Sequence, residues 1–210
     1  MTVSTLELVD YRRRVAKIYA DVLDEGVNRQ SWERWRDART DLLLTHVQSP
    51  VGNRNQFGST LPYFDYDPSW SVIGTVSPLA SADIPRKMAE GSSILNQIGW
   101  VSFEREEKTH RLGLFWLDAY GGGLMLPFRD TTNGSSTYGA GRYVLDGAKS
   151  ADLGSVGPDQ LVLDFNFAYH PSCMWDPQWA CPLAPRSNHL AISVEAGEQM
   201  PLFTATDAER

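Results

Sequence analysis

The sequence predicts an α+β fold, in which an N-terminal pair of helices precedes a mainly antiparallel, curved or barrel-like β-sheet. Over residues 1–48 apolar side chains recur at helical spacing, whereas residues 61–198 hold short β-branched and aromatic segments with no helices between them. Parallel strands need crossover connections, usually helices, so this order of elements favours antiparallel pairing. We expect one domain over residues 1–210, and a flat sandwich is the alternative form of the sheet.

Each predicted helix has a start signal and a stop signal. Ser4 begins a capping box ahead of a helix predicted at residues 5–24, and Gly26 follows it as a stop. Asn28 is the expected N-cap of the second helix, which ends at Pro50 because the residue before a proline disfavours helical geometry. We expect the two helices to cover the sheet.

Short β-branched or aromatic segments predict the strands, at residues 70–76, 100–104, 112–117, 124–128, 161–165 and 190–194. The charged turn at residues 106–109 predicts that the second and third of these strands form an antiparallel hairpin. Residues 169–188 separate the last two strands by more than an ordinary loop length. Long ordered loops tend to be functional, so this excursion is a place to look for a site.

Composition and charge exclude several classes of partner. The formal net charge is −7, and the longest basic run is Arg12-Arg13-Arg14, so the chain lacks the basic face that duplex nucleic acid requires. Acidic residues precede any apolar stretch of signal-peptide length, and no segment approaches the ~18 apolar residues that span a bilayer. We therefore expect a cytoplasmic protein that binds neither nucleic acid nor membrane.

Familiar catalytic and nucleotide-binding motifs are absent. Gly139 and Gly141 would need a third glycine where Val144 stands to make a dinucleotide-binding turn. A phosphate-binding loop that begins at Gly134 would place Ala140 where its lysine belongs. Neither a G-x-S-x-G nucleophile elbow nor an H-E-x-x-H helix occurs. The sequence identifies no cofactor.

A dense polar stretch around the Asn133-Gly134 turn signal is the first candidate site. Thr137, Tyr138 and Arg142 follow this turn and supply a hydroxyl, a phenol and a guanidinium. Arg142 could hold a carboxylate or phosphate with two hydrogen bonds, while Tyr138 orients or protonates it. The alternative is that Arg142 pairs with Asp130 or Asp164 in a buried network that closes the sheet.

A second candidate group follows the strand predicted at residues 161–165. If that strand continues, Asp164 and Asn166 share one face, where Asp164 could act as a general base in a wet cavity. The alternative is that both side chains bond the amides of the nearby loops. The predicted catalytic residues are Asp130, Tyr138 and Asp164, and the predicted ligand-binding residues are Arg129, Thr137, Arg142, Asn166, Tyr169 and Asn188.

The two cysteines allow three interpretations. With His170, Cys173 and Cys181 supply up to three metal ligands, but their spacing matches no zinc pattern, and we predict no metal site. A disulfide or redox pair and buried unpaired thiols are the other options, and a reducing compartment disfavours the disulfide.

Taken together, many of these residues resemble a bacterial and archaeal family known only as domain of unknown function 1684. The resemblance covers nearly the whole chain and is carried by segments at residues 35–36, 41–42, 46–50, 61–63, 67–70, 128–134, 137–143, 164–166, 168–169, 181–182 and 196–198, with single matches at Pro171, Cys173, Pro185 and Asn188. The family usually has Asn in place of His170 and an aromatic residue in place of Leu43. Membership implies a single β-rich domain in an intracellular, prokaryotic setting, and it implies no established activity.

Our leading hypothesis from the sequence is a β-rich domain that binds a small, anionic or polar metabolite, with acid-base catalysis as an option. The alternative is a non-catalytic structural or partner-binding protein, such as a homo-oligomer. Redox or metal chemistry at the cysteine pair is the third hypothesis.

Overall fold

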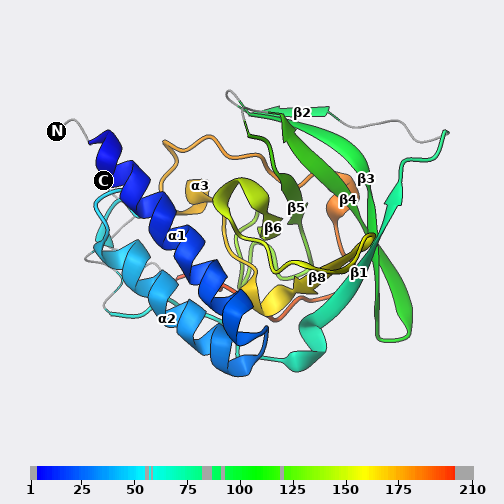
Figure 1. Cartoon of the computed structure of the whole chain (residues 1–210), viewed down its shortest axis with the longest axis horizontal. Coiled ribbons are helices and arrows are strands. Elements are labelled where there is room, and N and C mark those ends of the chain that lie inside the picture. The colour runs from blue at the N-terminus through cyan, green and yellow to red at the C-terminus, as the bar shows by residue number, and fades with distance from the viewer. Residues whose placement is uncertain are drawn as a thin grey trace.

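The computed structural model describes residues 4–54, 57, 59–81, 87–90, 93–118 and 121–201. Within these ranges, two long helices lie side by side against a curled, half-barrel antiparallel sheet (Figure 1). This arrangement confirms the predicted α+β class and the curved form of the sheet. No helix in these ranges is long and apolar enough to cross a membrane.

The two helices begin where their capping residues predict. Helix α1 spans Thr5–Glu25; the Ser4 hydroxyl accepts the Leu6 amide at 3.2 Å, and Glu7 accepts the Ser4 amide at 2.9 Å. Helix α2 spans Arg29–Thr45 and is capped by the Asn28 side chain. These bonds satisfy amides that the first helical turn leaves without partners.

The described strands are β1 (Ser71–Pro78), β2 (Lys87–Glu90), β3 (Ser93–Arg105), β4 (Lys108–Asp118), β5 (Leu124–Phe128), β6 (Arg142–Asp146), β7 (Ser155–Gly157) and β8 (Gln160–Asp164). They pair in the order β6-β5-β4-β3-β1-β8-β7, with β2 beside β3, and each pair is antiparallel. The predicted β3–β4 hairpin is present. Its turn holds Glu106 and Glu107 at φ of 52° and 59°, as a tight two-residue hairpin turn requires.

Several strand assignments differ between the prediction and the structure. Residues 190–194 are not a strand; this segment runs in irregular extended form, and its neighbour His189 makes only an isolated bridge to Arg129. Residues 142–146 do form a strand, β6, which the sequence analysis assigned to a polar site. The strand at 161–165 ends at Asp164, and the 3-10 helix Phe165–Phe167 follows, so Asp164 and Asn166 do not share a strand face.

Two apolar cores stabilise the fold. One lies within the curled sheet and includes Phe103, Leu126, Phe128 and Phe165. The second joins the helices to the sheet: Tyr19 of α1 and Trp35 of α2 belong to the same buried cluster as Met125, Tyr143 and Tyr169. Tyr143 of β6 also exchanges both backbone hydrogen bonds with Tyr169, at 2.9 and 3.0 Å. The helix pair is therefore held against β6 and the segment that begins at residue 169.

Candidate functional site

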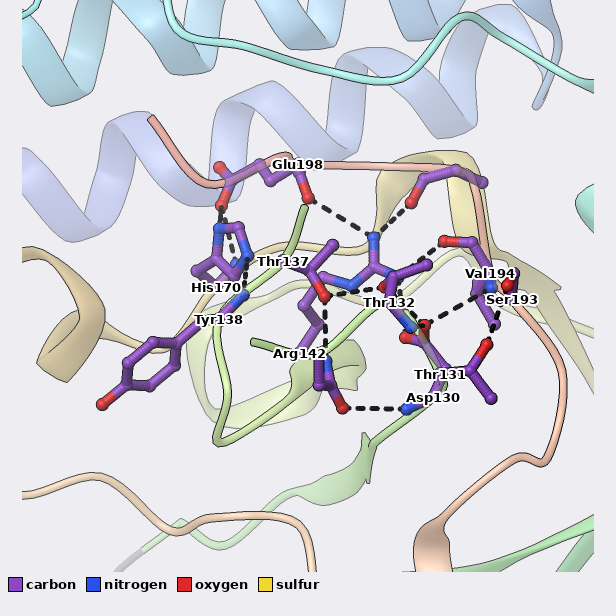
Figure 2. Close-up of polar contacts among 12 residues, drawn as sticks. Asp130, Thr131, Thr132, Thr137, Tyr138, Arg142, His170, Ser193, Val194 and Glu198 are labelled. Carbon is purple, nitrogen blue, oxygen red and sulfur yellow. Dashed lines mark hydrogen bonds and ion pairs between the residues drawn. The ribbon is translucent and has the colours of Figure 1, made fainter. Parts of the chain in front are cut away.

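Arg142 is at the centre of a sealed polar network (Figure 2). Its Nη2 donates to Asp130 Oδ2 at 2.9 Å and to the Val194 carbonyl at 2.7 Å, and its Nη1 donates to the Ala196 carbonyl. The Arg142 and Asp130 side chains are both 0% exposed. Burial lowers the pKa of Arg142, while the Asp130 carboxylate opposes that shift. These contacts match the alternative given in the sequence analysis, in which Arg142 and Asp130 form a buried pair that closes the sheet.

The turn at Asn133-Gly134 belongs to the same network. Asp130 Oδ1 accepts the Thr132 amide at 2.7 Å, and Thr137 Oγ1 contacts the Thr132 hydroxyl at 2.7 Å and the Asn133 side-chain amide at 2.9 Å. The Tyr138 side chain points away from this group, as Figure 2 shows. Its ring lies perpendicular to the His170 ring, with centroids 6.5 Å apart. The structure therefore brings Asp130, Thr137 and Arg142 together and separates Tyr138 from them.

The other predicted residues make local structural contacts. Asp164 Oδ1 accepts the backbone and side-chain amides of Asn166 at 2.9 and 2.7 Å, and burial raises the pKa of Asp164. Asn188 bonds both backbone groups of Gly113 and the Pro127 carbonyl, at 2.8 to 2.9 Å. The Arg129 backbone pairs with residues 188 and 190. A catalytic or binding role for these residues stays a prediction.

A cavity of about 680 Å³ lies elsewhere, between α1, β6 and residues 169–182. Of the predicted site residues, it includes Tyr169. Its apolar lining contains Leu8, Val15, Ala16, Leu43, Leu117 and Met125, and its polar lining contains Tyr19, Arg39, Tyr143, Asp146, Tyr169 and His170. Both layers of the fold thus contribute to one cavity, which is partly open to solvent.

A buried cluster of charged and polar groups lies beside this cavity. Arg39 Nε donates to Glu198 Oε1 at 2.7 Å, and the His170 amide donates to Glu198 Oε2 at 2.7 Å. The Arg39 and Glu198 side chains are 10% and 2% exposed. Burial alone would raise the pKa of Glu198, but the charge of Arg39 and the bonds from His170 and Arg39 lower it to about 2. Glu198 is therefore ionised at neutral pH.

The hydrogen bonds of His170 define its tautomer. The Tyr138 amide donates to His170 Nε2 at 3.2 Å, which assigns the proton of a neutral ring to Nδ1. That nitrogen lies 3.4 Å from Glu198 Oε2 (Figure 2). Burial lowers the pKa of His170, against the opposing effect of Glu198, so the ring is neutral at physiological pH.

Arg39 lines the cavity and has donors without a partner among the described residues. Its guanidinium lies over the Tyr169 ring, 4.5 Å from the centroid, and only its Nε has a hydrogen-bond partner among the described residues. Tyr169 in turn donates to Asp146 Oδ2 at 2.9 Å, and Tyr143 donates to the Pro182 carbonyl at 2.6 Å. The two tyrosine hydroxyls are thus satisfied within the protein, whereas the terminal nitrogens of Arg39 are open to a further acceptor.

Both cysteines are free thiols, and Cys181 lines the same cavity. The Cys173 amide donates to Cys181 Sγ at 3.3 Å. Burial and the neighbouring Cys181 raise the pKa of Cys173 to about 11, which makes this thiol a poor nucleophile at neutral pH. In the part of the chain that the structure describes, no three His, Cys, Asp or Glu side chains are grouped to hold a metal ion.

The sequence analysis did not assign Arg39, Asp146 or Glu198 to the site. Arg39 did give a signal, because it occupies the apolar side of the second helix, where a charge needs a buried partner. Glu198 lies 159 residues away along the chain, and no local pattern connects the two. Only the folded structure shows that they are partners.

Comparisons with other proteins identify relatives of this chain but no activity. A family model described as "Protein of unknown function (DUF1684)" matches residues 56–199. A similar solved structure is the solution NMR structure of an uncharacterized protein of Haloarcula marismortui, with 32% sequence identity and a TM-score of 0.61. That match covers 83% of this chain and 97% of the archaeal chain. Among curated proteins, none matches the chain.

Proposed function

The chain belongs to the DUF1684 family, and on that premise we propose that it is a small-molecule-binding domain whose ligand occupies the cavity between α1 and the sheet. The observation that carries the proposal is the cavity itself. Its volume of about 680 Å³ falls within the range of ligand sites, and its lining is mainly apolar with a few converging polar groups.

Unsatisfied polar atoms in the lining support the proposal. The indole nitrogen of Trp175 and the hydroxyl of Tyr19 are buried without a well-formed hydrogen bond among the described residues; the Trp35 indole is a neighbour of the Tyr19 hydroxyl. Buried polar groups in folded proteins nearly always have partners. A bound molecule in the cavity would provide acceptors or donors for both.

The proposed function of the cavity is to bind a ligand, and it includes no reaction. The Asp130–Arg142 network is sealed from this space, so the anion-binding role that the sequence analysis gave to Arg142 is proposed here for Arg39 instead. Acid-base catalysis by Asp130, Tyr138 or Asp164 stays a prediction from the sequence.

The first experiment is native mass spectrometry of the purified chain, followed by titration with the neutral fluorescent probe N-phenyl-1-naphthylamine. We expect either a retained ligand, seen as excess mass, or a saturable rise in probe fluorescence. Ala16→Trp places an indole in the cavity and should abolish probe binding, whereas Ala20→Trp makes the same change on the exposed side of α1. Equal probe binding by the two folded variants, or no ligand and no probe binding in the wild type, would overturn the proposal.

A further inference from the structure

We infer that the ligand is a monocarboxylate with an apolar body, and that the guanidinium of Arg39 binds its carboxylate. This inference rests on the proposed function, because it names the class of molecule that the same cavity would take.

The orientation of Arg39 is the first argument. The Nε–H bond to Glu198 at 2.7 Å and the stacking on Tyr169 at 4.5 Å hold the guanidinium plane in place. Both terminal nitrogens lack a hydrogen-bond partner among the described residues, and Arg39 lines the cavity. A fixed guanidinium with two open nitrogens matches the two oxygens of a carboxylate.

The Tyr19 hydroxyl is the second argument. It lines the same cavity without a well-formed hydrogen bond in the described structure. Burial raises the pKa of Tyr19, and the charge of Arg39 is the largest opposing influence, which indicates that the two groups lie near each other. Tyr19 can therefore donate a hydrogen bond to the acid that Arg39 binds.

The charge of the cavity is the third argument. Its lining carries four cationic side chains, Arg12, Arg13, Arg39 and Lys149. Asp146 in the lining and Glu198 behind Arg39 carry two negative charges, which leaves a local balance of 4 − 2 = +2 in a chain of net charge −7. This local excess favours an anion over a cation.

The apolar side chains that line the cavity indicate the chemistry of the rest of the ligand. Val15 and Ala16 of α1 lie across the cavity from Met125 of β5, and Leu8, Leu43 and Leu117 extend this surface. A sugar or nucleotide would bury hydroxyl and ring polar atoms against these side chains without partners, which is unfavourable. An acyl chain or a similar hydrocarbon body leaves no such groups unpaired.

The test compares decanoate with decan-1-ol as competitors of N-phenyl-1-naphthylamine at neutral pH, because the two differ only in the head group. We expect decanoate to displace the probe at roughly tenfold lower concentration, as a charge-assisted pair predicts. Arg39→Gln should remove this preference. Arg36→Gln, which changes an arginine of the same helix that lines no part of this cavity, should keep it.

The outcomes separate the two proposals. If the probe binds but decanol competes as well as decanoate in the wild type, the ligand class is wrong and the binding function stands. If the purified chain retains no ligand and the probe does not bind, the proposed function itself fails. Should Arg39→Gln leave Glu198 unpaired and unfold the chain, the double variant Arg39→Gln with Glu198→Gln removes both charges and should also lose the preference for decanoate. A folded variant that lacks the Arg39 guanidinium and keeps this preference would overturn the assignment of Arg39.

Discussion

Two buried arginine–carboxylate pairs lie on either side of residues 194–198, and they differ in what surrounds the guanidinium. Arg142 and Asp130 are 2.9 Å apart, and the Arg142 terminal nitrogens also donate to backbone carbonyls of that segment. Arg39 and Glu198 are 2.7 Å apart, and Arg39 lines a cavity, with no partner for its terminal nitrogens among the described residues. The same pair of chemical groups thus closes the fold in one region and leaves donors for a ligand in the other.

The difference teaches that a buried ion pair has to be judged by its remaining hydrogen-bonding groups. An arginine has five N–H donors, and a carboxylate uses at most two of them. At Arg142 the terminal N–H groups also bond the carbonyls of Val194 and Ala196, while the buried Nε has no partner among the described residues. At Arg39 the terminal N–H groups have no such partners in the described part of the chain.

The largest expected effect on stability follows from breaking the buried Arg142–Asp130 pair. Arg142→Met leaves the Asp130 carboxylate buried without its cation and two carbonyls without their donor. We expect the free energy of unfolding to fall by about 3–5 kcal/mol, the usual effect of breaking a buried pair. Urea unfolding followed by circular dichroism measures it. Arg129→Met is the control, and an equal small loss in both variants would contradict the structural role of Arg142.

Low pH should weaken the Arg39–Glu198 pair over a defined range. The pKa of Glu198 is lowered from 4.5 to about 2 in the folded chain, so its contribution is present above pH 4.5 and is lost as the pH falls towards 2. This contribution is on the order of 3 kcal/mol. The stability difference between wild type and Glu198→Gln, from urea unfolding at several pH values, should therefore shrink over this range. A difference that stays constant would contradict the ionised, paired state of Glu198.

Replacing Arg142 or Arg39 with lysine tests the difference between the two buried pairs further. An ammonium at position 142 cannot reach Asp130 and the carbonyls of Val194 and Ala196 as the planar guanidinium does. We expect Arg142→Lys to lower the free energy of unfolding by about 2 kcal/mol and Arg39→Lys by about 1 kcal/mol, because fewer hydrogen bonds are lost. Thermal unfolding of the two variants side by side checks the order. The reverse order would show that Arg39 is the more constrained of the two.

The smallest expected effect concerns His170. Its pKa lies below the ordinary value of 6.5, so the unfolded chain binds more protons as the pH falls below 6.5, and stability declines there. Asn is uncharged at every pH, and His170→Asn should be nearly neutral at about pH 7.5. At about pH 5.5 the wild type should lose up to ~1 kcal/mol relative to the variant. Urea unfolding at the two pH values measures this, and parallel pH profiles would contradict it.

Local signals in the sequence predicted local structure well. Ser4 and Asn28 cap the two helices as expected, and the charged turn before β4 forms the predicted hairpin. Predictions failed where side chains replace backbone partners. Residues 190–194 have strand-like composition, but in the described part of the chain only Leu190 and Ile192 bond a neighbouring backbone, at Arg129 and Thr131. The backbone of Val194 bonds the side chains of Arg142 and Asp130 instead.

The candidate site shows the same limit. Arg142 and Asp130 are 12 residues apart, and the sequence analysis named their pairing as one of two alternatives. Arg39 and Glu198 are 159 residues apart, and the cavity beside them forms between a helix and a loop that meet only in the folded chain. Their spacing along the chain did not indicate that these segments contact each other in the fold.

By itself, the sequence determined the α+β class, the starts of both helices, the central hairpin and the family; helix α2 ends at Thr45, before the predicted stop at Pro50. These features depend on interactions between residues close in the chain, such as caps, turns and hydrophobic periodicity. The tertiary structure alone decided which arginine is sealed and which one faces a cavity. That choice depends on long-range packing, because the environment of a buried charge is set by whichever distant segments surround it.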